Sequence, residues 1–170
     1  MKLLESLHNY DLHTFDWCLR RKHLATLTTA SRWLSKTADG HLYVIGVLVL
    51  IICDQQLMAS VLTLALCAER LLYFVLKNNF KRNRPPQAIP GFKSVVEPSD
   101  QFSFPSGHTS AAFLCATLVC QWLPEVGGLL YLWAGLVGVS RVLLGVHFPT
   151  DTLAGAALGH SIAVLALTLV

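Results

Sequence analysis

The sequence predicts an all-α protein, a multi-span transmembrane helical bundle of about five spans with an amphipathic helix at its N-terminus. Of its 170 residues, 54% are hydrophobic and only 14% are charged, a balance that soluble domains of this size rarely show. Five apolar segments are separated by short polar breaks or breaks that contain proline and glycine. They run from about Leu42 to Cys53, Leu57 to Leu76, Ala111 to Leu123, Val126 to Val146 and Leu153 to Val170.

The first and third apolar segments are shorter than the roughly 20 residues that cross the hydrocarbon layer of a bilayer. Each is therefore expected to recruit flanking residues or to lie obliquely. The alternative is a soluble protein with buried helices. Five such segments in 170 residues leave too little polar sequence to cover them, so we favour the membrane protein.

The residues before the first span have a different pattern. Leu12, Phe15 and Leu19 repeat at helical spacing, and the run Arg20-Arg21-Lys22 then interrupts the apolar pattern. This predicts an amphipathic helix that lies at the membrane surface. The chain is accordingly divided into an interfacial segment, residues 1–40, and a transmembrane domain, residues 41–170.

A first group of polar residues follows the second apolar segment. Lys77 closes that segment, and Arg84 follows seven residues later, directly before Pro85-Pro86. Arginine binds phosphate through paired hydrogen bonds, and the prolines stiffen the chain after it. Basic residues at a membrane boundary also commonly anchor a helix end, so this group by itself does not indicate a site.

A second group, Pro105-Ser106-Gly107-His108, precedes the third apolar segment. Ser106 or a neighbour can cap that helix, whose first backbone N–H groups bind anions. Gly107 lets a phosphate approach the backbone. His108 then lies beside the anion, where it is a plausible acid. The alternative is an ordinary capped helix with a polar histidine.

A third group begins with Arg141, near the end of an apolar helix. Charged groups at membrane depth are costly and usually line a polar cavity. Pro149 suits the first turn of the last helix, which places His147 just before it and Asp151 within that turn. The carboxylate could hold one imidazole nitrogen and leave the other free to attack. A helix-capping pair is the alternative.

Together, the three groups are similar, residue for residue, to the signature of the type 2 phosphatidic acid phosphatase family, also called the PAP2 or vanadium haloperoxidase superfamily. That signature is Lys, six residues, Arg-Pro; then Pro-Ser-Gly-His; then Ser-Arg, five residues, His, three residues, Asp. It reads here as Lys77 to Arg84-Pro85, Pro105 to His108, and Ser140-Arg141 to His147 and Asp151. The resemblance, to short bacterial members, covers about Tyr43 to the C-terminus.

The resemblance implies a membrane lipid phosphatase. His147 would attack phosphorus and form a phosphohistidine, Asp151 would orient it, and His108 would protonate the leaving oxygen and later activate water. The residues that would hold the phosphate are Lys77, Arg84, Ser106, Gly107 and Arg141. The sequence lacks the carboxylate cluster that Mg²⁺ or Zn²⁺ requires, so neither a metal nor another cofactor is expected.

The substrate stays open among undecaprenyl diphosphate, phosphatidylglycerol phosphate, phosphatidate and lipid A, because the motifs are common to relatives that act on each. We expect a lipid phosphate in the bilayer as the partner, and no nucleic acid. A vanadate-dependent haloperoxidase and a catalytically silent lipid-binding protein are the alternatives. The expected location is the bacterial inner membrane. The positive-inside rule places the motifs in the cytoplasm, whereas the resemblance points to the outer face.

Glu69 and Arg70 place two charges inside the second span. Arg70 and Lys77 are seven residues apart and share a helix face, which is expected to turn toward the active-site cavity. Adjacent helical residues do not face each other. Glu69 is therefore expected to pair with a site arginine, or in a structural ion pair between helices, rather than with Arg70.

Overall fold

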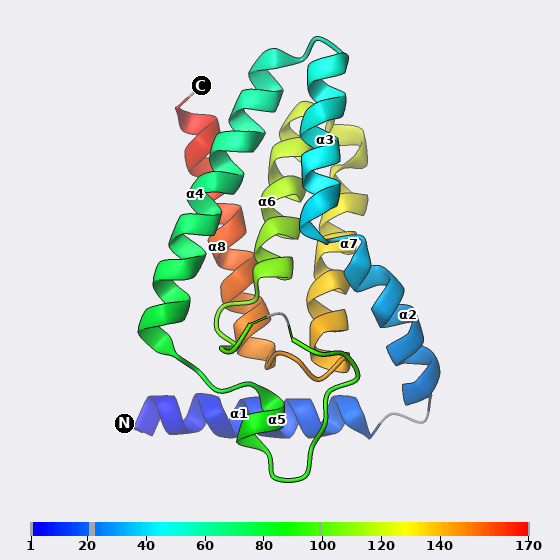
Figure 1. Cartoon of the computed structure of the whole chain (residues 1–170), viewed down its shortest axis with the longest axis vertical. Helices are drawn as coiled ribbons and strands as arrows, with labels where there is room; N and C mark the ends of the chain where they lie inside the picture. The colour runs from blue at the N-terminus through cyan, green and yellow to red at the C-terminus, as the bar shows by residue number, and fades with distance from the viewer. Residues whose placement is uncertain (1, 21–22, 99, 170) are drawn as a thin grey trace.

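The computed structural model, which describes residues 2–20, 23–98 and 100–169, contains eight helices in these ranges, as the sequence predicts for an all-α protein (Figure 1). Five of them form a bundle: α3 (Gly40–Ile52), α4 (Gln56–Phe80), α6 (Gly107–Trp122), α7 (Pro124–Leu143) and α8 (Pro149–Thr168). The helix α1 (Lys2–Leu19) lies across one end of the bundle, and α2 (Leu24–Lys36) rises obliquely from that end. The short α5 (Pro85–Ala88) lies in the long loop at the same end.

The five predicted apolar segments all form helices, but not all of them are long enough to span a bilayer. Among the described residues, three helices satisfy the length and hydropathy of a span, and a fourth is obtained if α2 and α3, bent by 40°, count as one. The helix α6 has 16 residues, which corresponds to about 24 Å. These criteria leave out α6, which is short, and accept α3 only together with α2, as expected from the short first and third apolar segments.

The apolar side chains divide between a small core and a large exposed surface. The helix α6 stands in the centre of the bundle (Figure 1), and Ala112, Leu114, Ala116 and Leu118 are fully buried on it. By contrast, α3 has no buried residue. Exposed leucine, isoleucine and valine side chains cover the outer faces of α3, α4, α7 and α8. Such a surface suits hydrocarbon rather than water, as expected for an integral membrane protein.

Two glycines allow α6 and α8 to approach closely. A Cβ atom at Gly155 would lie 2.5 Å from the carbonyl oxygen of Ser106, and one at Gly159 would lie 1.9 Å from that of Ser110. Small residues four positions apart allow backbone contact between membrane helices. This contact fixes the start of α6 against the start of α8, which are the two places where the sequence predicts catalytic residues.

The N-terminal segment forms two helices where the sequence predicts one. Phe15 of α1 is 1% exposed and contacts the rings of Phe92 and Phe148, with centroid distances of 5.2 and 5.6 Å. The helix α2 packs on α7. The predicted breaks at Arg21 and Lys22 lie outside the described residues. In the structure, α1 packs its apolar face on the loops at the end of the bundle.

The long loop between α4 and α6 is irregular but packs closely on the end of the bundle. Arg84 and Ser103 are 3% and 0% exposed. The backbone N–H of Val95 donates to the carbonyl of Leu144 at 2.9 Å, which ties the loop to the turn between α7 and α8. The loop therefore brings Arg84, of the first predicted group of polar residues, close to the turn that carries His147, of the third group.

Candidate active site

The turn between α7 and α8 carries the histidine predicted as the nucleophile. His147 is 2% exposed, and its Nε2 atom lies 3.3 Å from Nη1 of Arg84. Its Nδ1 atom lies 3.7 Å from Oδ2 of Asp151. Burial lowers the pKa of the imidazole to about 4, although the Asp151 carboxylate acts in the opposite direction. The ring is therefore neutral at pH 7 and keeps a nitrogen lone pair.

Two residues explain why the chain turns at this point. Gly145 has a φ of 75°, a left-handed conformation that glycine adopts without strain. A Cβ atom at this position would lie 2.6 Å from the ring of Phe92. Pro149 begins α8, as predicted, because its missing N–H and restricted φ suit the first helical turn. His147 thus lies just before α8, and Asp151 lies within the first turn.

Asp151 is fully buried and accepts hydrogen bonds at both oxygens. Its Oδ2 atom accepts the backbone N–H of Phe148 at 2.8 Å, and Oδ1 accepts Nη1 of Arg82 at 2.7 Å. Through Nη2, Arg82 also donates to Oδ2 of Asp11 in α1 at 2.5 Å. The sequence reasoning did not assign Arg82 or Asp11, because one belongs to a basic run and the other is an isolated acid.

Replacement of Arg82 by glutamine is expected to lower the free energy of unfolding by about 2 kcal/mol. The buried carboxylates of Asp11 and Asp151 would lose their shared cation, which is costlier than loss of an exposed ion pair. The arginine side chain is itself 24% exposed, so the effect is below that of a fully buried pair. Chemical or thermal unfolding in detergent measures the change. Lys81→Gln, at the exposed neighbour, is the control, and equal stability of the two variants would contradict the prediction.

Lys77 and Arg84 converge on one carboxylate, that of Asp100 in the loop before α6. The Oδ2 atom accepts from Nζ of Lys77 at 2.8 Å and from the hydroxyl of Tyr73 at 2.7 Å, and Oδ1 accepts from Nη2 of Arg84 at 2.5 Å. Burial alone would raise the pKa of Asp100, but these donors outweigh it and lower the pKa to about 2. The ionised Asp100, which the sequence reasoning missed, therefore holds both cations in place.

Arg141 and His108 contact the N-terminal part of the chain. Nη1 of Arg141 donates to Oγ of Ser35 at 2.6 Å, while its buried Nε atom has no hydrogen-bond partner among the described residues. Nε2 of His108 lies 3.1 Å from Oδ1 of Asp39, which directly precedes α3. A buried donor without a partner is costly, so the Nε–H of Arg141 is suited to an anionic ligand.

Ser106 and Gly107 lie at the start of α6. Ser106 occupies the N-cap position, as predicted, but its side chain makes no capping hydrogen bond. Its buried hydroxyl instead pairs with Oγ1 of Thr109 at 2.9 Å. At Gly107, a Cβ atom would lie 3.0 Å from the ring of Tyr73. Gly107 thus lets the Tyr73 ring pack close to the start of α6, and the Ser106 hydroxyl is engaged within the helix.

A cavity of about 300 Å³ lies between these groups. Five of the eight predicted site residues line it, namely Arg84, Gly107, His108, Arg141 and His147. Asp151 lies beside Nδ1 of His147. Lys77 pairs with Asp100, which itself lines the cavity. Tyr43, Arg70, Tyr73 and Asp100 also line the cavity. Three arginines and two histidines around one cavity favour a phosphate group as the ligand.

The two charges inside α4 have separate surroundings. Glu69 is fully buried, and its Oε2 atom lies 3.7 Å from Nη2 of the neighbouring Arg70. Glu69 therefore pairs with its neighbour, contrary to the expectation, and both of its carboxylate oxygens are without a hydrogen-bond partner among the described residues. Arg70 lines the active-site cavity, as expected from its seven-residue spacing from Lys77.

Among the described residues, no three His, Cys, Asp or Glu side chains gather in a group that could hold a metal ion. The independence of the site from metal stays a prediction. It is checked by measurement in the presence of EDTA, below.

Comparisons with known proteins agree with this geometry. Phosphatidylglycerophosphatase B of Bacillus subtilis (strain 168) is 42% identical to the chain over 102 residues, which cover 54% of this chain and 47% of the relative. The crystal structure of Aquifex aeolicus LpxE superposes with a TM-score of 0.83 and 28% identity, and the match covers 92% of this chain and 94% of the other. The structure of a transmembrane PAP2 type phosphatidylglycerolphosphate phosphatase from Bacillus subtilis gives a TM-score of 0.79 and 26% identity over 96% and 86%.

The chain spans about half the length of the curated relatives it matches. The sequence model of the PAP2 superfamily matches residues 58–170, which include all three predicted groups of site residues. This match covers the greater part of the chain, and the two solved structures share its fold over nearly their whole length. The chain therefore belongs to the PAP2 superfamily.

Proposed function

We propose that the protein is a membrane lipid phosphatase that hydrolyses a phosphate monoester or diphosphate of a lipid through a phosphohistidine at His147. The observation that carries this proposal is the placement of His147. Its Nε2 atom meets Arg84 at the cavity, and Asp151 lies at the opposite nitrogen. A neutral imidazole with a carboxylate beside one nitrogen and a phosphate-binding arginine beside the other is placed to attack a phosphate that Arg84 binds.

In the first step, Nε2 of His147 attacks phosphorus, and the bond from phosphorus to the lipid oxygen breaks. His108 gives a proton to that oxygen, so the lipid leaves as an alcohol or as a lipid monophosphate. Burial and the nearby Arg141 lower the pKa of the His108 imidazole to about 4, against the contact with Asp39, so the negative charge of the substrate phosphate has to favour the protonated ring. The carboxylate of Asp151 balances the positive charge that develops on His147.

In the second step, His108 takes a proton from water, and the water oxygen attacks phosphorus. The bond from phosphorus to Nε2 breaks, which returns His147 to its neutral form and releases inorganic phosphate. Arg84, Arg141 and the backbone at Gly107 hold the phosphoryl oxygens in both steps, since charge-assisted donors stabilise the transition state. Lys77 and Ser106 have supporting roles, because Lys77 is anchored through Asp100 and the hydroxyl of Ser106 pairs with Thr109.

The proposed location is the bacterial inner membrane. The apolar outer faces of the helices and the bacterial origin of the similar proteins support it. The end of the bundle that α1 crosses (Figure 1) would be at the lipid headgroups, within reach of a lipid phosphate.

Phosphate release from purified protein tests the proposal. The full chain in detergent micelles is given a lipid diphosphate, phosphatidylglycerol phosphate, phosphatidate or lipid A, each with EDTA present. We expect inorganic phosphate from at least one lipid at an undiminished rate with EDTA. Release that requires added Mg²⁺ or Zn²⁺ would contradict the metal-independent mechanism, and no release from any of the lipids by folded protein would contradict the proposed function.

A further inference from the structure

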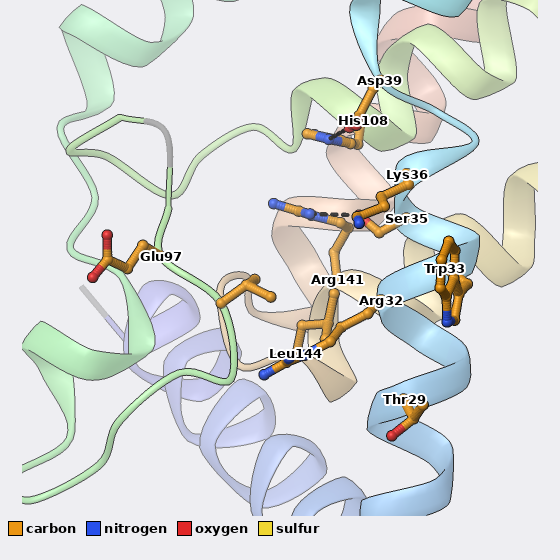
Figure 2. Close-up of a pocket in the computed structure, with 11 residues that line it drawn as sticks. Thr29, Arg32, Trp33, Ser35, Lys36, Asp39, Glu97, His108, Arg141 and Leu144 are labelled. Atoms are coloured by element: carbon orange, nitrogen blue, oxygen red, sulfur yellow. Dashed lines mark hydrogen bonds and ion pairs between the residues drawn. The ribbon is translucent and has the colours of Figure 1, made fainter.

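A second cavity adjoins the candidate active site and is larger than it. It measures about 540 Å³ and lies between α2, the end of α7 and the loop around Val96 (Figure 2). Its charged lining consists of Arg32, Lys36, Asp39, Glu97, His108 and Arg141. The proposed catalytic steps use only the last two of these side chains on the substrate, so the cations of α2 are unexplained by the chemistry at His147.

The two cavities share a wall. Both are lined by His108 and Arg141, and His147 lines only the smaller one. A substrate with its scissile phosphate at His147 therefore has the leaving group on the His108 side, since His108 is the proposed proton donor to the leaving oxygen. The larger cavity is the space into which the atoms just beyond that oxygen extend.

The cations in the larger cavity are positioned by the protein. Arg32 and Lys36 are four residues apart on α2 and so share one face of the helix. Nη2 of Arg32 donates to the carbonyl of Val95 at 2.8 Å, which uses one of its five N–H groups. Nζ of Lys36 lies 5.0 Å from the ring centroid of Trp33. Both side chains thus keep donors for a ligand.

The two acids in the lining do not neutralise these cations. Asp39 contacts His108 at 3.1 Å. Glu97 comes from the loop on the opposite side of the cavity, and Figure 2 shows its carboxylate turned away from Lys36. Arg141, between the two cavities, adds its unpartnered Nε–H. The larger cavity therefore has an excess of cationic donors at the place where a leaving group would lie.

We propose that Arg32 and Lys36 form a subsite for a second phosphate group, carried on the leaving-group side of the scissile bond. This inference rests on the proposed function and narrows its substrate class. The second phosphate belongs either to a lipid diphosphate, in which it is the inner phosphate, or to a phosphatidylglycerol phosphate, in which it is the phosphodiester. Phosphatidate has no such group and cannot use the subsite.

Substrate selectivity tests the subsite. The value of kcat/KM is measured for short-chain forms of a lipid diphosphate, phosphatidylglycerol phosphate and phosphatidate with the wild-type protein and with the R32Q/K36Q double variant. We expect the double variant to lose roughly 30-fold on at least one substrate with two phosphates, as for loss of charge-assisted hydrogen bonds, and to change far less on phosphatidate. The substrate with the larger loss identifies the source of the second phosphate. Lys93→Gln, at an exposed lysine outside the cavity, is the matched control and should change none of the three.

Equal losses on all three substrates, or no loss on any, would overturn the subsite while leaving the phosphatase activity intact.

A second measurement does not depend on turnover. Inorganic pyrophosphate should raise the Tm of the wild-type protein more than orthophosphate does, and the double variant should lose this difference. Equal stabilisation of the wild-type protein by the two anions would also overturn the subsite, whereas failure of the proposed function appears separately as absence of phosphate release from every lipid.

Discussion

His147→Gln is expected to lower kcat for lipid phosphate hydrolysis by roughly 10⁴-fold or more, the scale at which removal of a catalytic nucleophile acts. Glutamine keeps a polar side chain of similar length, but its amide nitrogen cannot attack phosphorus to form the phosphorus–nitrogen bond of a phosphohistidine. The buried imidazole makes no hydrogen bond through Nδ1, so we expect the fold to tolerate the replacement. Phosphate release under saturating substrate measures the effect.

The covalent intermediate gives a second readout. Wild-type protein, quenched during turnover of a substrate labelled in the transferred phosphate, should retain label that is stable to alkali and released by acid, and the H147Q variant should retain none. The matched control is His160→Gln. His160 lies on α8 beside Thr117 and Tyr131, outside the lining of the active-site cavity. Label on H147Q, or full activity of that variant, would show that another residue is the nucleophile.

Gly159→Val is expected to destabilise the protein by about 4 kcal/mol, above the usual cost of overpacking. A Cβ atom at Gly159 would lie 1.9 Å from the carbonyl oxygen of Ser110, and a backbone atom cannot move aside as a flexible side chain can. Either α6 and α8 separate or the helix hydrogen bonds of α6 distort. Because α6 carries His108 and α8 carries Asp151, activity should fall together with the Tm in detergent.

The control for this variant is a glycine at which an added side chain would have free space. At Gly135 in α7, a Cβ atom would meet nothing within 4 Å, so Gly135→Ala should be neutral or slightly stabilising through its better helix propensity. Gly159→Ala tests the contact with the smallest possible side chain and should be destabilising while Gly135→Ala is not. Equal stability of the two alanine variants would contradict the close approach of α6 and α8.

Five of the eight residues that the sequence proposes for the site line one cavity in the structure, and their spacing in the sequence is what singles them out. Pro149 at the start of α8 and Ser106 at the N-cap of α6 follow from local rules of helix termini. Asp100 could not be found in this way. It lies between the first and second groups with no helix to define its direction, and only the folded loop brings it to Lys77 and Arg84.

The contact between α6 and α8 could be predicted only in part from the sequence. The spacing of Gly155 and Gly159 is a sequence signal for close helix packing, but it does not say which helix is the partner. The two apolar segments that the sequence marks as short correspond to α3 and α6. Hydropathy does not separate a central helix such as α6, which is covered by neighbours, from a helix that faces lipid.

The sequence by itself determined that the chain is a helical membrane protein, since the length of an apolar run is a local property, and its resemblance to the PAP2 signature singled out eight candidate residues for phosphate chemistry. Only the tertiary structure shows how the two N-terminal helices contribute to the site. Asp11 of α1 is linked to Asp151 through Arg82. The helix α2 places Arg32 and Lys36 in the cavity that His108 also lines. These contacts join residues more than 65 positions apart. Their cause is the packing of α1 and α2 on the end of the bundle, which no local pattern in the chain encodes.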